Sequence, residues 1–108
     1  FPLESGLLTG KYRAGEALPP GSRFAKWRGG GSFASAGRYA LVERLRDWGA
    51  ARGFSVLDIA IGWLAARPFV ASVIAGVTSA DQLRANAAAT RFVPDAAADR
   101  ELDALLAG

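Results

Sequence analysis

The stretches FPLESGLLTGKY, residues 1–12, and VIAGVTSADQLRAN, residues 73–86, decide the fold predicted for this chain. The second stretch completes a β-branched apolar run, residues 70–75, which is typical of a strand buried on both faces of a parallel sheet. Ser79 and Gln82 then have the spacing of a capping box, which predicts a helix to about residue 89. The pattern therefore indicates a strand that leads directly into a capped helix.

Such a junction is also a candidate anion site. Gly76, Val77 and Thr78, followed by the capped helix, would present free backbone N–H groups and the positive end of a helix dipole. Gly76 would also let a ligand approach the backbone closely. Taken alone, these residues favour a purely structural interpretation, in which Gly76 makes a tight turn and Ser79 and Gln82 only cap the helix.

The first stretch has the residue types of a phosphate-binding loop. Its small and apolar residues let the backbone and one hydroxyl lie against a pyrophosphate, with two basic side chains as charge partners. These residues are Pro2, Leu3, Ser5 and Gly6, with Lys11 and Arg23 as the cations. The alternative is an ordinary strand end with solvated basic residues, and the residues alone leave both interpretations open.

The composition excludes several kinds of chemistry. With 108 residues, 51% of them hydrophobic, the chain has room for one small domain, and no apolar run approaches the roughly 20 residues that span a bilayer. The absence of cysteine excludes disulfides and is compatible with a cytoplasmic setting, so we expect a soluble, cytoplasmic protein. The absence of histidine removes the commonest general base and metal ligand, and we expect no metal site.

Basic residues gather near the N-terminus of a chain whose net charge is +3. A nucleic-acid interpretation rests on one glycine-rich segment in which basic and aromatic residues alternate: Arg23, Phe24, Lys26, Trp27 and Arg28. Two rings without a recognisable module are weak evidence. A cofactor phosphate is therefore the favoured anion, and we expect neither a nucleic-acid nor a membrane partner.

The remainder of the sequence predicts a long loop followed mainly by helices. Residues 10–37 form the loop, and a helix starts near Arg38 and ends at Gly53, which suits the left-handed C-terminal position. A second helix is capped by Ser55 and Asp58 and stopped by Pro68. A last helix opens at residues 94–95 and carries an apolar stripe at positions 102, 105 and 106.

Together, in this order, the two quoted stretches resemble the last two strand-end loops of the aldo-keto reductases, (β/α)8-barrel enzymes that use NADPH. The resemblance implies an α/β fold for residues 1–108: the C-terminal third of a TIM barrel, mostly helical with one or two short strands. In the family a Ser or Thr, a Gln and an Asn contact the adenosine end of the cofactor, matched here by Thr78, Gln82 and Asn86. Residues that wrap the phosphates are matched by Pro2, Leu3, Gly6, Gly10, Lys11, Tyr12, Ser22 and Arg23.

The chain departs from the family's pattern at two places. Some branches bind the 2′-phosphate with a Lys and an Arg in the closing segment, where this chain has Gly76 and Gln82. The resemblance implies NADP as the cofactor, and these two uncharged residues leave its preference over NAD open. The acidic residue often found before the Asn is Ala85, which removes one ribose or adenine contact.

The resemblance also implies what this chain lacks. The family's Tyr, Lys, Asp and His come from earlier strands, and a chain without histidine cannot assemble that set. We assign no catalytic residue, and we expect the chain alone to be inactive. In the parent enzyme, hydride would pass from NADPH to an aldehyde or ketone.

Two other functions remain open: a noncatalytic NADP-binding or regulatory module, and a helical interaction domain. Because two strands cannot close a barrel, the expected partner is the remainder of the barrel or a second copy of the chain.

Overall fold

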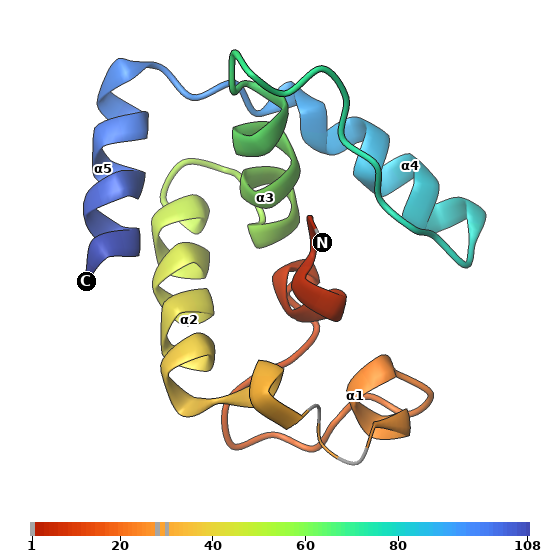
Figure 1. Cartoon of the computed structure of the whole chain (residues 1–108). Coiled ribbons are helices and arrows are strands. Elements are labelled where there is room, and N and C mark those ends of the chain that lie inside the picture. The colour runs from red at the N-terminus through yellow and green to blue at the C-terminus, as the bar shows by residue number, and fades with distance from the viewer. Residues whose placement is uncertain (1, 28, 30) are drawn as a thin grey trace.

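Helices joined by irregular segments make up the described part of the chain, residues 2–27, 29 and 31–108, in a computed structural model (Figure 1). In chain order they are η1 (Glu4–Thr9), α1 (Arg23–Lys26), η2 (Gly31–Ala34), α2 (Ala36–Ala50), α3 (Val56–Ala65), α4 (Ala80–Ala88), η3 (Ala89–Arg91) and α5 (Ala96–Ala107), the η elements being 3-10 helices. Helix α2 packs against α3 and α5, while α4 projects away on the opposite side from α5. Within the described residues, no helix is long and apolar enough to cross a membrane.

The four predicted helices are present, and local side chains cap each of them. Ser35 accepts a hydrogen bond at the start of α2, so that helix begins two residues before the predicted Arg38. Gly53 has a φ of +78° beyond its end, the left-handed conformation expected there. Ser55 and Asp58 form the predicted capping box of α3, with N···O distances of 3.0 and 3.1 Å.

The predicted strands are absent from the described residues. Residues 70–75 are irregular, and Ile74 is 85% exposed rather than buried between two layers. A strand needs a neighbour for its N–H and C=O groups, and nothing in the described chain pairs with this segment. The first stretch is not extended either, because η1 turns sharply at Ser5 and Gly6, whose φ values are +59° and +97°.

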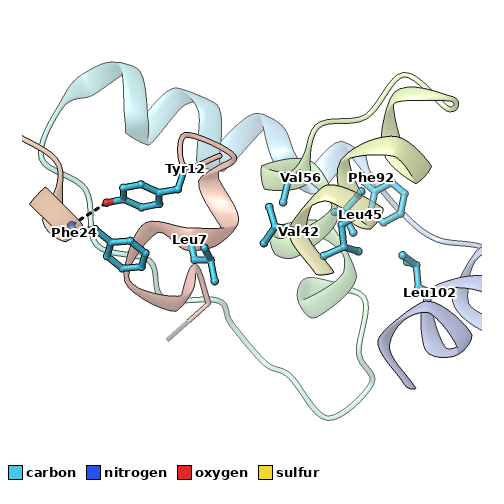
Figure 2. Close-up of a cluster of buried hydrophobic side chains, with 9 residues drawn as sticks. Leu7, Tyr12, Phe24, Val42, Leu45, Val56, Phe92 and Leu102 are labelled. Atoms are coloured by element: carbon cyan, nitrogen blue, oxygen red, sulfur yellow. Dashed lines mark hydrogen bonds between the residues drawn. The ribbon is translucent and has the colours of Figure 1, made fainter. Parts of the chain in front are cut away.

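The loop at residues 10–37 is partly ordered by a buried aromatic pair. Tyr12 and Phe24 stack at 4.1 Å between ring centroids, and the N–H of Phe24 donates to Tyr12 Oη at 3.1 Å (Figure 2). Leu7 lies with them at one end of the buried cluster. The other end of the cluster contains Val42, Leu45, Val56, Phe92 and Leu102. The stacked pair therefore holds the loop against η1. Arg28, which belongs to the segment of alternating basic and aromatic residues, lies outside the described residues.

A close contact between α3 and η3 positions α4. A Cβ atom built on Gly62 would lie 2.3 Å from the backbone oxygen of Phe92, so only glycine permits this approach. Arg91 adds an ion pair with Asp58 at 3.3 Å. Burial raises the pKa of Asp58, but hydrogen bonds from Ser55 and Arg91 outweigh it and hold the pKa below its ordinary value. Since η3 continues directly from α4, these contacts also hold α4 in place.

Candidate functional site

A cavity of about 710 Å³ lies between η1, α1 and the segment that leads into α4. Residues from both quoted stretches line it, although they are more than 60 positions apart in the sequence. Nine of the ten predicted site residues are among its lining: Leu3, Ser5, Gly6, Lys11, Arg23, Gly76, Thr78, Gln82 and Asn86. Pro2 is the exception, because it borders a separate apolar cavity of about 480 Å³ between η1, α2 and α3.

Gly6 shapes the first wall of the 710 Å³ cavity. Its left-handed backbone turns η1, and a Cβ atom here would lie 3.2 Å from both Cε and Nζ of Lys11. The lysine therefore folds back over this glycine, with its Nζ 5.3 Å from the ring centroid of Tyr12. Thr9 closes the turn by donating from its hydroxyl to the Gly6 carbonyl at 2.6 Å. A side chain at position 6 would displace the cation.

Helix α1 brings two more cations to the cavity. Ser22 caps it by accepting from the N–H of Ala25 at 3.3 Å. Arg23 and Lys26 are three positions apart and so lie on one face of this short helix. Phe24 points the other way and is fully buried against Tyr12. The buried ring therefore fixes the helix with its basic face toward the cavity.

The second wall is a turn closed by its own side chains. The Thr78 N–H donates to Gln82 Oε1 at 2.7 Å, and the Thr78 hydroxyl donates to the same oxygen at 3.1 Å. Ser79 Oγ accepts from the Gln82 N–H at 3.2 Å. The prediction of free N–H groups at this junction is therefore wrong for Thr78. The capping box is also incomplete, because Gln82 bonds to Thr78 and not back to Ser79.

Most basic residues outside the cavity form ion pairs in the described chain, whereas the cations of the cavity do not. Outside the cavity, seven arginines pair with carboxylates: Arg13, Arg38, Arg46, Arg52, Arg67, Arg84 and Arg91. Among the described residues, no carboxylate pairs with Lys11, Arg23 or Lys26, and none lines the cavity. Arg23 contacts the Trp27 ring instead, at 5.4 Å from its centroid. Three cations without a counter-charge make the cavity attractive to anions.

Lys26 and Trp27 are lining residues that the predicted site did not include. The available signal was the three-residue spacing of Arg23 and Lys26 after a capping serine. A helix of four residues is too short to show a periodic pattern in the sequence, so this spacing did not predict α1. The described residues contain no group of three acidic or other ligating side chains that would hold a metal ion.

The described residues thus form helices joined by irregular segments, with a cavity lined by three cations and no carboxylate. Residues 1–107 match the Aldo/keto reductase family, and the chain belongs to this family. The family's fold is a TIM barrel, and its members are generally NAD(P)H-dependent oxidoreductases. The two quoted stretches therefore identified the family correctly.

Curated relatives support the same family. The chain is 35% identical over 100 residues to a "Probable voltage-gated potassium channel subunit beta" of Arabidopsis thaliana, covering 86% of this chain and 29% of the relative. A protein of the same name from Oryza sativa subsp. japonica has the same identity and coverage. "Protein tas" of Escherichia coli (strain K12) is 33% identical over 90 residues, covering 78% of this chain and 24% of the relative. The chain thus spans less than a third of the length of these relatives.

Proposed function

We propose that this chain is the C-terminal part of an NADPH-dependent aldo-keto reductase and that its 710 Å³ cavity receives the phosphates and adenosine of the cofactor. The observation that carries the proposal is the unpaired charge of the cavity. Lys11, Arg23 and Lys26 converge there without a carboxylate, whereas most other described basic side chains are paired. A dinucleotide brings at least two phosphate charges to balance them.

The residues present fit such a ligand in two groups. Lys11 and Arg23 supply charge for the pyrophosphate, beside the small residues Ser5 and Gly6. At the other wall, Gly76 keeps the backbone accessible, and Gln82 and Asn86 offer side-chain amides toward the adenosine. The oxygen of the Gln82 amide is already used by Thr78, so its nitrogen is the group left for a ligand.

The bound cofactor supplies a hydride for the reduction of an aldehyde or ketone. The residues of this chain bind and orient the cofactor and take no part in proton transfer. The chain contains no histidine, and both of its phenols have other positions. Tyr12 is buried under Phe24, and Tyr39 packs against the core from α2. The groups that hold the carbonyl belong to the remainder of the barrel.

Fluorescence titration of NADPH against the full-length protein tests this proposal. Arg23→Ala should weaken binding roughly ten- to a hundredfold, as expected for a lost charged hydrogen bond to a phosphate. The difference should shrink as salt rises, because the guanidinium is exposed. Arg44→Ala is the matched control, since Arg44 is exposed on α2 and lines neither cavity. Equal affinities of both variants would refute the site.

A second candidate is a module that binds the cofactor without turnover. Two relatives bear the name of a voltage-gated potassium channel subunit, and these names favour this candidate. Consumption of NADPH on addition of an aldehyde separates the two, because a module would bind NADPH and leave it unoxidised. Failure to bind NADPH at all would favour the helical interaction domain instead.

A further inference from the structure

Tyr12 contacts both of the segments that supply cations to the 710 Å³ cavity, although it is not one of the lining residues. Its side chain is buried, and its Cε2 lies 3.6 Å from the position of a Cβ atom on Gly6. The Nζ of Lys11 lies 5.3 Å from the centroid of the same ring. The Tyr12 hydroxyl accepts the N–H of Phe24, the neighbour of Arg23 in α1. One buried side chain therefore touches the supports of both Lys11 and Arg23.

The helix that carries Arg23 depends on the hydroxyl of Tyr12. Helix α1 has four residues, too few to persist on its own backbone hydrogen bonds, and its first N–H groups have no partner within the helix. Ser22 Oγ accepts from Ala25 at 3.3 Å, and Tyr12 Oη accepts from Phe24 at 3.1 Å, twelve positions away in the sequence. Figure 2 shows the second bond at one end of the buried cluster. Because this bond is buried, loss of the hydroxyl would leave the Phe24 N–H unpaired and loosen α1.

The ring of Tyr12, by contrast, acts on Lys11. An ammonium group within about 6 Å of an aromatic centroid is attracted to the face of the ring. Lys11 is exposed, and a lysine side chain loses much rotational freedom when it is held in one place. The ring and the turn at Gly6 limit that freedom before any ligand arrives. The ring and the hydroxyl of Tyr12 therefore act on different cations of the cavity.

We propose that Tyr12 is the positioning residue of this cavity: its ring holds Lys11, and its hydroxyl holds the helix that carries Arg23. The inference rests on the proposed dinucleotide site and identifies the side chain that preorganises it. Tyr12 touches no ligand, because it is buried and does not line the cavity. A cavity whose α1 is loose must spend part of the binding free energy on ordering that helix, so its affinity for an anion falls.

The test is a pair of double-mutant cycles on the affinity of the full-length protein for NADPH. Tyr12→Phe keeps the ring and removes the hydroxyl, so the affinity should fall roughly five- to tenfold. In an Arg23→Ala background the same change should alter the affinity less than about twofold, because the arginine through which it acts is gone. In a Lys11→Ala background it should keep its full effect. A merely structural hydroxyl would not distinguish the two backgrounds.

Two controls separate positioning from loss of folded protein. Tyr39→Phe removes the hydroxyl of the other phenol, which packs against the core from α2 and lines neither cavity, and should leave the affinity unchanged. Circular dichroism at the titration temperature verifies that every variant is folded. Hydrogen exchange of the Phe24 N–H in the wild-type protein needs no variant: saturation with NADPH should slow it, because the ligand favours the state in which α1 is ordered.

Different outcomes identify different errors. If Arg23→Ala weakened binding but Tyr12→Phe did not, the inference would be overturned, while the dinucleotide site would stand. An equal effect of Tyr12→Phe in the Arg23→Ala and Lys11→Ala backgrounds would overturn it as well, and so would an unchanged exchange rate of the Phe24 N–H. If Arg23→Ala left binding intact, the dinucleotide site itself would fail, and the inference with it.

Discussion

Gly62 is the point at which α3 and η3 approach most closely, and Gly62→Ala should loosen the attachment of α4. A Cβ atom at this position would lie 2.3 Å from the Phe92 carbonyl oxygen, 2.8 Å from Phe92 Cβ and 3.0 Å from the Ala89 carbonyl oxygen. Real Cβ atoms essentially never approach other atoms within 3.0 Å, so the two segments must separate by roughly 0.7 Å. Two of the three obstructing atoms are backbone oxygens, which cannot rotate away.

The magnitude follows from two opposing effects. Overpacking of this kind costs about 1 to 3 kcal/mol, and the backbone obstruction favours the upper end. Alanine stabilises a helix interior by about 1 kcal/mol relative to glycine. The free energy of unfolding should therefore fall by about 2 kcal/mol. Since α4 continues into η3, displacement of η3 should also shift Gln82 and Asn86 and weaken NADPH binding.

Urea unfolding of the full-length protein, followed by far-ultraviolet circular dichroism, measures this loss. The matched control is Gly37→Ala in α2, where a Cβ atom would meet nothing within 4 Å. That variant should be unchanged or more stable by up to about 1 kcal/mol. If Gly62→Ala proved as stable as Gly37→Ala, the close contact between α3 and η3 would be refuted, and with it the placement of α4.

Three further predictions concern the loop, the ion pair and the exposed surface. Tyr12→Phe keeps the ring but leaves the buried N–H of Phe24 without its acceptor, so thermal unfolding should indicate a loss of about 1 to 3 kcal/mol. The pKa of Asp58 in the folded protein lies below its ordinary 3.8, so the carboxylate contributes to the free energy of unfolding above that pH. This contribution is lost as the pH falls through the folded pKa. In urea titrations below pH 3.8, acidification should therefore lower the free energy of unfolding less in Asp58→Asn than in the wild type. Phe69 and Ile74 are 84% and 85% exposed, so the isolated 108-residue chain should self-associate or be partly molten, and a compact monomer in sedimentation at micromolar concentration would contradict this.

The helices could be predicted because their boundaries depend on neighbours in sequence. Ser55 and Asp58 cap α3 through hydrogen bonds across three residues, and Ser79 caps α4 in the same way. Gly53 lies in the turn beyond the end of α2, where it adopts a backbone conformation that other residues rarely reach. Local reasoning of this kind could not establish a strand at residues 70–75, because a β-branched run becomes a strand only when another strand pairs with it.

The sequence by itself indicated the family, through two motifs, and the capped starts of four helices, because those depend on residues close together in the chain. Only the tertiary structure decided which cations stay unpaired. Arg13 meets Glu43 across 30 positions and Arg38 meets Glu4 across 34, whereas Lys26 is directed by the buried ring of Phe24 into a cavity without carboxylates. Charge pairing acts over a few ångströms in space, and separation along the chain does not reveal that distance.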